Sequence, residues 1–202
     1  MSDEPALLAA ILAHPDEDTP RLMYADWLQE HGQPERAEFI RIQCDPTANE
    51  AAEARAEELE ERHRGKWLAG LPQFPGARWE FRRGFPEYLD TEAGLFLHRY
   101  EAFVRVPWLR FLSLFGLDNS LVRDFVNRPW SPRWVEMELA EDAATADEPG
   151  DYDGTPSIIA IATCPQVRQL RRLYLALFTF REEGAQAIAS LREHFGDRLV
   201  IG

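Results

Sequence analysis

Cysteine is scarce in this chain of 202 residues, which contains only Cys44 and Cys164. Two thiols so far apart do not form the disulfide framework of a small secreted domain, so we expect both to be reduced and buried. The acidic N-terminus lacks the basic region and cleavage site of a signal peptide, and no long apolar run follows it. These absences predict a cytoplasmic protein that is not inserted in a membrane.

Positive charge is also in short supply, because 22 Lys and Arg residues face 35 Asp and Glu residues, for a formal net charge of −13. A surface of this sign repels phosphate backbones, so we expect no nucleic-acid partner. The content of hydrophobic residues, 45%, is that of a folded globular protein. A basic or neutral protein is the partner that this charge favours.

Motifs that carry chemistry are missing as well. The chain has no glycine-rich phosphate loop, no cysteine pair at zinc spacing and no dinucleotide fingerprint. Cys164 precedes a proline and has no neighbouring base in the sequence, which indicates a structural thiol rather than a nucleophile. We therefore expect no cofactor, no catalytic residue and no enzymatic activity.

One acidic cluster, the segment from His14 to Asp18, supports an alternative function. His14, Asp16, Glu17 and Asp18 are residue types that bind divalent metals, and His31 follows on the next predicted helix. A metal-dependent enzyme or regulator is the function that such a site would support. Pro15 interrupts the helical spacing, however, and carboxylates before a helix stabilise its N-terminus. We expect these carboxylates to cap a helix and to bind no metal.

What the chain does contain, in its first third, is helical periodicity. Caps at Ser2 or Asp3 and at Asp18 or Thr19 predict two helices, which end at His14–Pro15 and at Gly32, and Pro34 opens a third. The inward-facing residues expected for the second and third helices are Leu22, Met23, Ala25, Trp27, Leu28, Ala37, Phe39, Ile40 and Cys44. An Ala- and Glu-rich stretch, residues 49–72, predicts a long solvated helix.

The second predicted helix contains a carboxylate, Asp26, and two aromatic residues, Tyr24 and Trp27, for which we expect different roles. Asp26 is expected to bond to Arg21, Arg36 or Arg41 and so to tie helices together. Tyr24 and Trp27 are expected to be core or inter-domain anchors whose polar ends find a partner.

An apolar pattern repeats in the second part of the chain. The segments "PWLRFLSL", "PRWVEMEL" and "QLRRLYL" share it, with middle positions Leu112, Met137 and Leu173, and a shorter copy ends at Leu199 and Ile201. "GFPEYLD", around Tyr88, is a plausible first copy. The middle positions are separated by 24, 25, 36 and 26 residues, and the long interval contains the acidic insertion "EDAATADEPGDYDG". A strand and a helix at this period predict stacked parallel strands.

These segments together resemble a known bacterial family. "LLAAILAHPDEDTPRLMYADWLQEHGQPERAEFIRIQ" resembles the N-terminal helical module of repeat-companion domain proteins, and "RRGFPEYLD" resembles the start of their degenerate leucine-rich repeats. The resemblance covers nearly the whole chain and implies an architecture rather than an activity. Leu117 and Phe178 stand where the leucine-rich consensus has an asparagine.

The predicted fold is therefore α/β, with a helical module over residues 1–72 and a short leucine-rich-repeat-like parallel solenoid over residues 73–202. Alternation along each strand assigns one set of side chains to the concave face. The residues assigned to it are Phe111, Ser113, Phe115, Glu136, Glu138, Arg172 and Tyr174. We expect a protein partner to bind there, since exposed aromatic and Arg residues are frequent in interfaces. An immunity- or inhibitor-type protein that neutralises a basic partner is the alternative, and Phe111 and Phe115 would have no binding role if another segment covered them.

Overall fold

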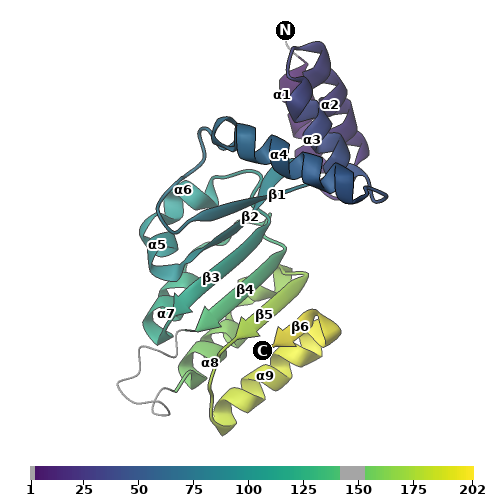
Figure 1. The fold of residues 1–202 in the computed structure, drawn as a ribbon. Helices are drawn as coiled ribbons and strands as arrows, with labels where there is room; N and C mark the ends of the chain where they lie inside the picture. The colour runs from purple at the N-terminus through teal and green to yellow at the C-terminus, as the bar shows by residue number, and fades with distance from the viewer. Residues whose placement is uncertain (1–2, 142–152) are drawn as a thin grey trace. The chain divides into compact units, whose positions relative to one another are not determined.

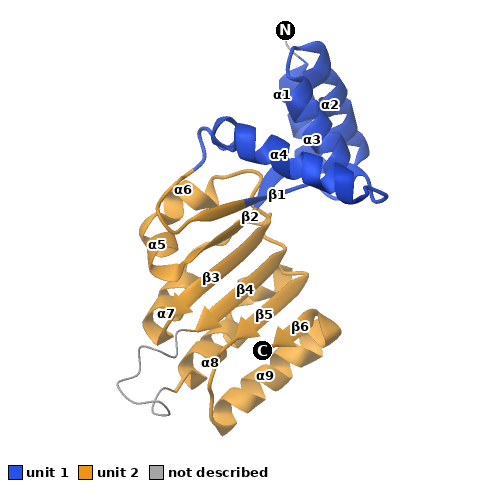
Figure 2. Ribbon diagram, viewed as in Figure 1, with its two compact units in different colours: residues 1–71, 80–87 blue, residues 72–79, 88–202 orange. Residues whose placement is uncertain are grey.

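The computed structural model describes residues 3–141 and 153–202, which form a mixed α/β structure (Figure 1). It divides into two compact units, residues 1–71 with 80–87 and residues 72–79 with 88–202 (Figure 2). Residues 80–87 thus group with the helical unit, although they follow the boundary expected after residue 72. Most of the acidic insertion lies outside the described residues.

The first unit contains the helices expected from the sequence. Their bounds are α1 Glu4–Ala13, α2 Thr19–Glu30, α3 Pro34–Cys44 and α4 Glu50–Trp67. The inward face predicted for α3 is confirmed, because its four named residues are at most 9% exposed. The Asn49 side chain accepts a hydrogen bond from Ala52 N, 3.0 Å away, and so caps α4.

The inward face predicted for α2 is partly wrong. Leu22 and Met23 are 39% and 55% exposed. The residues that α2 buries are Pro20, Arg21, Tyr24, Ala25 and Leu28. From Arg21 onward this is the i, i+3, i+4, i+7 spacing of one helix face, and a charged residue occupies its first position. Leu22 and Met23 follow Arg21 directly and lie outside that face.

A tight turn joins strands β1 (Arg78–Arg82) and β2 (Phe85–Glu92). Both turn residues have positive φ angles, 50° at Arg83 and 84° at Gly84. A two-residue turn with this geometry matches the twist of the strands that it joins. Arg83 and Gly84, the two residues of the turn, belong to the first unit.

The second unit contains the remaining strands and helices, which alternate along the chain. Its later strands are β3 Phe111–Leu117, β4 Glu136–Glu141, β5 Arg172–Ala176 and β6 Leu199–Ile201. Its helices are α5 Ala93–His98, α6 Tyr100–Val104, α7 Asn119–Val126, α8 Thr155–Thr163, η2 Pro165–Gln169, α9 Glu182–Phe195 and η3 Gly196–Arg198. The sheet follows chain order from β1 to β6, and β2 to β6 pair in parallel.

The register confirms most of the equivalences drawn from the sequence. Leu112 lies beside Met137, Met137 beside Leu173, and Leu173 beside Leu199. The equivalence of Tyr88 with Leu112 is wrong by one residue, because Tyr88 pairs with Phe111 and Leu89 pairs with Leu112. A shift of one residue moves every side chain of a strand to the other face of its sheet.

Helices α5, α7, α8 and α9 lie along one face of the parallel sheet (Figure 1). Aromatic side chains fill the interior on that side. Phe96 stacks on Phe103 with ring centroids 5.2 Å apart and also contacts Phe125 and Trp134. The other face of β3, β4 and β5 carries side chains of a different kind. In the described ranges, 3–141 and 153–202, no helix is long and apolar enough to span a membrane.

Candidate functional site

Side chains alternate between the two faces along the first four residues of β3, β4 and β5, and the register of β3 against β4 shifts between Leu114 and Leu117. The residues directed toward the helices are at most 1% exposed; they are Leu112, Leu114, Met137, Leu139, Leu173 and Leu175. The side chains between them point the other way and are mixed in character. Because the period of a strand is two residues, these leucines and Met137 fix the identity of both faces.

The face opposite the helices, here called the open face, is described by its register. Phe111 lies beside Glu136, which lies beside Arg172, and in the next row Ser113, Glu138 and Tyr174 are neighbours. All seven residues assigned to the concave face from the sequence therefore lie on one side of the sheet. Strand β2 adds Tyr88, Asp90 and Glu92, which pair with Phe111, Ser113 and Phe115.

The three contributions of β2 are absent from the sequence-based site. Tyr88 had been equated with the buried Leu112, so its strand was placed one residue out of register. The alternation of β2 is hidden in the sequence because two of its buried positions, Glu87 and Thr91, carry polar side chains. Leu89, which is fully buried, is the residue that indicates the correct register.

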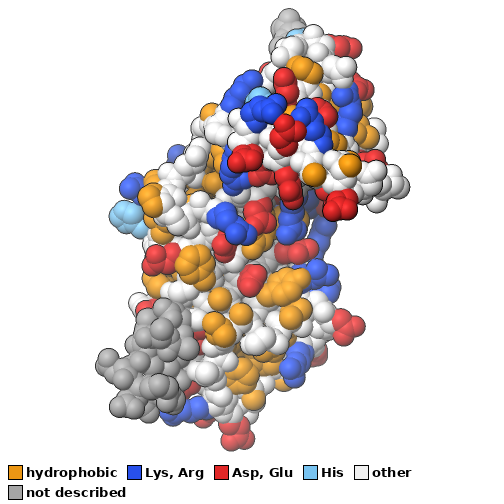
Figure 3. All heavy atoms as spheres, in the orientation of Figure 1, with side chains coloured by type: hydrophobic (Ala, Val, Ile, Leu, Met, Phe, Trp, Pro, Cys, Tyr) orange, Lys and Arg blue, Asp and Glu red, His pale blue; other side chains and the backbone are white. Residues whose placement is uncertain are grey.

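The open face combines aromatic and charged groups. Phe115 is 42% exposed, whereas Ser113 is 7% exposed because larger side chains surround it in the sheet. Arg172 donates a hydrogen bond to the Tyr174 hydroxyl, at 3.1 Å, and its Nη1 lies 4.0 Å from a Glu136 carboxylate oxygen. The Tyr174 hydroxyl, followed by the Glu136 charge, raises the pKa of Arg172. Figure 3 shows hydrophobic side chains next to acidic ones over the strands of this unit.

Arginine also contacts an aromatic ring at the start of β3. The Arg110 guanidinium carbon lies 5.4 Å from the Phe111 ring centroid, and that of Arg172 lies 5.9 Å from the Tyr174 ring centroid. These distances are in the range of cation–π attraction. The open face is thus a surface on which guanidinium groups already rest against rings.

The acidic cluster around His14 has structural contacts. His14 Nδ1 lies 3.2 Å from a Glu17 carboxylate oxygen. Asp18 precedes α2 but makes no side-chain cap, and its carboxylate instead accepts a hydrogen bond from Arg83 Nε at 2.6 Å. Asp18 therefore occupies the predicted N-cap position, but the predicted side-chain capping bond is absent, because the carboxylate bonds to the guanidinium of the turn instead. Among the residues that the structure describes, no group of three His, Cys, Asp or Glu is placed to hold a metal ion.

Three sequence blocks meet at the Arg83–Gly84 turn. Arg21 donates to Arg83 O at 3.1 Å, Arg36 donates to Gly84 O, and Gly84 N donates to Gln43 Oε1 at 2.7 Å. Arg21 belongs to the block "DTPRLMYADWLQEHG", Arg36 and Gln43 to "RAEFIRIQ", and the turn to "RRGFPEYLD". The residues that carry the resemblance in the first unit therefore organise its interior.

Arg36 is enclosed by aromatic rings. Its guanidinium carbon lies 4.5 Å from the centroid of Trp67, 5.1 Å from that of Phe81 and 5.5 Å from that of Phe39. Burial in this cage lowers the pKa of Arg36 to about 10. Arg36 is half-buried, and its contacts join α3 to the rings of Trp67 and Phe81 and to the turn at Gly84.

The other polar residues of α2 tie helices together. Asp26 lies 2.7 Å from Arg41, which is one of the three partners expected for it. The Tyr24 hydroxyl lies 3.1 Å from Glu4 Oε1, and the Tyr24 ring stacks on Trp27. Trp27 is also stacked on His31, with centroids 4.0 Å apart.

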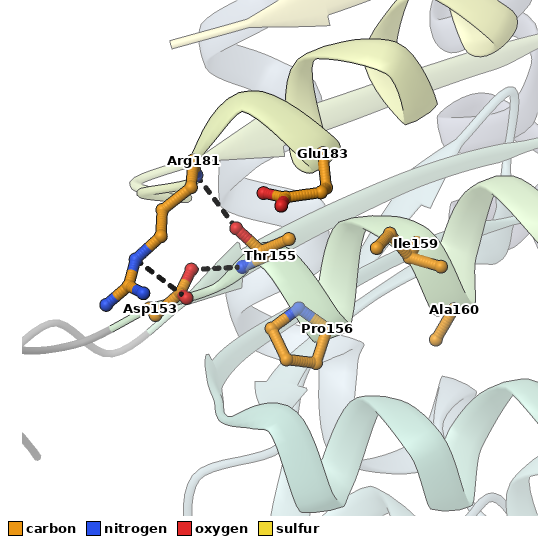
Figure 4. Close-up of a pocket in the computed structure, with 7 residues that line it drawn as sticks. All are labelled: Asp153, Thr155, Pro156, Ile159, Ala160, Arg181 and Glu183. Atoms are coloured by element: carbon orange, nitrogen blue, oxygen red, sulfur yellow. Dashed lines mark hydrogen bonds and ion pairs between the residues drawn. The ribbon is translucent and has the colours of Figure 1, made fainter.

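A shallow depression of about 550 Å³ lies between the starts of α8 and α9 (Figure 4). The groups that line it bond to one another: Asp153 accepts from Thr155 N at 3.0 Å and from Arg181 Nε at 3.1 Å. Arg181 N in turn donates to Thr155 Oγ1 at 2.8 Å. The bonds from Thr155, more than the Arg181 charge, lower the pKa of Asp153. These contacts join two helices and leave the open face as the candidate site.

Comparisons of the chain with protein-family models, with curated proteins and with solved structures found no match. The open face is therefore interpreted from its own residues.

Proposed function

We propose that this protein is a non-catalytic interaction module that binds a protein partner on the open face of its sheet. The observation that supports this most is the composition of the face. Phe115, 42% exposed, and Tyr174 lie among carboxylates and Arg172, on the side opposite the helices. Aromatic and Arg side chains contribute most of the binding energy in many protein interfaces.

The architecture proposed for this role is a strand–helix repeat solenoid of the leucine-rich type, preceded in the chain by the helical module of a repeat-companion domain protein. The neighbouring positions of Leu112, Met137, Leu173 and Leu199 support the repeat. Stacked repeats present the same strand position side by side, which produces a continuous binding surface. The helices of the first unit and their bonds to the Arg83–Gly84 turn support the helical module.

A selection from a random 12-residue peptide display library tests this function with the full chain as bait. The triple variant Phe111→Ser, Arg172→Glu, Tyr174→Ala serves for comparison. Selected peptides are expected to bind the variant at least tenfold more weakly, about 1.4 kcal/mol, while the melting temperature changes little. Peptides that bind both proteins equally, or a variant that no longer folds as the parent does, would contradict the proposal that this face binds.

A control variant distinguishes an effect of the open-face residues from an effect of the protein's net charge. Glu193 and Asp197 are exposed acidic residues in α9 and η3. The double variant Glu193→Gln, Asp197→Asn removes two charges from the helical side of the sheet. It is expected to bind the selected peptides as the parent does.

A further inference from the structure

We infer that the open face holds an arginine side chain of its partner, above Ser113 and between Asp90 and Glu138, an inference that rests on the proposed function. The register places Ser113 of β3 between Asp90 of β2 and Glu138 of β4. Along β3 itself, Phe111 and Phe115 precede and follow Ser113 on the same face. Ser113 is thus surrounded on four sides, by the two carboxylates across the strands and by the two rings along β3. We call this arrangement the frame, and Ser113 its floor.

The carboxylates of Asp90 and Glu138 form no hydrogen bond or ion pair within residues 3–141 and 153–202. The Glu136 carboxylate on the same face, in contrast, lies 4.0 Å from Arg172. Of the two, Glu138 is exposed and Asp90 is half-buried. Partial desolvation of a carboxylate without a cation is unfavourable, and a cationic ligand would relieve it.

The floor of the frame is a polar group without a bond. Ser113 is 7% exposed, and its hydroxyl makes no hydrogen bond with any side chain or backbone group in the described parts of the chain. Because Leu112 and Leu114 point toward the helices, the Ser113 side chain points to the open face. Ser113 has the shortest side chain in this part of the face, so its hydroxyl lies lower than the ends of the Asp90, Glu138, Phe111 and Phe115 side chains around it.

The dimensions of the frame favour a guanidinium over an ammonium group. Asp90 and Glu138 are separated by two strand spacings, about 10 Å between Cα atoms, and each ring lies about 7 Å along the strand from Ser113. A planar guanidinium donates hydrogen bonds from opposite edges, so it can reach both carboxylates while its face rests on Phe115. An ammonium group is a compact charge without such a face.

The protein already shows this mode of binding one strand away. Arg172 lies against the Tyr174 ring, at 5.9 Å, and close to the Glu136 carboxylate. Phe115 and Glu138 offer the same combination of ring and carboxylate without a guanidinium. The charge of the face agrees, because the carboxylates of Asp90, Glu92, Glu136 and Glu138 outnumber the guanidinium groups of Arg110 and Arg172.

An NMR titration of the full ¹⁵N-labelled chain tests the inference with a defined probe, acetyl-Gly-Arg-Gly-amide. Saturable shifts are expected at the amides of Asp90, Ser113 and Glu138, with a dissociation constant of about 1–10 mM. The double variant Asp90→Asn, Glu138→Gln is expected to bind at least fivefold more weakly. The Glu193→Gln, Asp197→Asn variant, which loses the same charge elsewhere, is expected to bind as the parent does.

Two further peptides test which properties of the arginine side chain, its charge or its planar shape, are needed for binding. The citrulline peptide keeps the shape of the side chain without its charge and is expected not to bind, and the lysine peptide is expected to bind at least threefold more weakly. Equal binding of citrulline and arginine, shifts confined to other residues, or unchanged affinity in the Asp90/Glu138 variant would each overturn the inference. Library peptides that depend on the open face but contain no arginine would leave the proposed function standing and remove the arginine site. Binding of the arginine peptide at this site, with no library peptide that depends on the open face, would support the arginine site and contradict the proposed function.

Discussion

Arg21 and Glu87 form an ion pair in which both side chains are almost completely inaccessible, at 0% and 3% exposure. Arg21 comes from α2 and Glu87 from β2, 66 residues later, and both belong to the first unit. The guanidinium also donates to Pro15 O and Arg83 O, at 2.8 and 3.1 Å. A buried cation with this many acceptors stabilises one specific arrangement of the helices and the turn.

Replacing Glu87 by Gln is expected to reduce the free energy of unfolding by about 3 kcal/mol, because it leaves the Arg21 charge buried without a counter-charge. Urea denaturation followed by tryptophan fluorescence measures the loss. Asp26→Asn is the matched control, since the Asp26–Arg41 pair is 71% and 37% exposed and is expected to contribute less than about 1 kcal/mol. Equal effects of the two variants would show that Arg21 does not depend on Glu87.

Gly84 is expected to tolerate no side chain. Its φ angle is +84°, and a Cβ atom there would lie 2.4 Å from Ile40 Cγ1. Gly70 has nearly the same φ angle, +86°, with nothing within 4 Å of the added Cβ atom. Gly70→Ala therefore measures backbone strain alone, about 1 kcal/mol. Gly84→Ala is expected to cost at least about 2 kcal/mol more by urea denaturation, and similar losses would mean that Ile40 moves aside easily.

The helices and most of the strand register could be predicted because each depends on a local period. Leu112 and Leu114, like Leu173 and Leu175, alternate with polar or aromatic residues, so the strand and its two faces follow from the sequence alone. The α3 face follows in the same way from the spacing of Ala37, Phe39, Ile40 and Cys44. These patterns are independent of distant contacts.

The features that could not be predicted depend on contacts between distant segments. Arg21 turns inward because Glu87 and the Arg83–Gly84 turn supply its acceptors, and no local pattern on α2 reports them. The Asp18 side chain makes no capping bond to α2 for the same reason, since Arg83 binds its carboxylate. On the open face, the misplaced register of Tyr88 hid Asp90, so the pairing of Asp90 with Ser113 required the structure.

Tyr24 is expected to make the first unit sensitive to alkaline pH. Burial, followed by the Glu4 charge, raises its pKa to about 12 from the ordinary value of 10.0. A raised pKa means that the folded protein holds the phenolic proton more tightly than the unfolded chain. The stabilisation is therefore complete below pH 10 and is lost as the pH rises toward 12. By pH 11 the loss is about 1.4 kcal/mol.

The variant Tyr24→Phe isolates this contribution, because it keeps the ring that stacks on Trp27 and removes the phenol. The lowered pKa of Arg36 acts in the opposite direction above pH 10, so the measured quantity is the difference between variant and parent. Urea denaturation at pH 8 and at pH 11 provides it. The free energy of the parent is expected to decrease by about 1.4 kcal/mol more than that of Tyr24→Phe, and parallel pH curves would contradict the role of Tyr24.

Adjacent residues of β3 are expected to differ sharply in their effect on stability. Leu114 is fully buried against the helices, so Leu114→Ala is expected to cost about 2–5 kcal/mol. Phe115 follows it on the open face and is 42% exposed, so Phe115→Ser is expected to change the free energy of unfolding by less than about 1 kcal/mol. Urea denaturation of both variants measures the contrast. If Phe115→Ser proved as damaging as Leu114→Ala, the ring would be part of the core, and the open face would lose its principal exposed aromatic group. A small effect would mean that a large apolar side chain is kept on this face without benefit to folding, which is the property expected of a residue that contacts a partner.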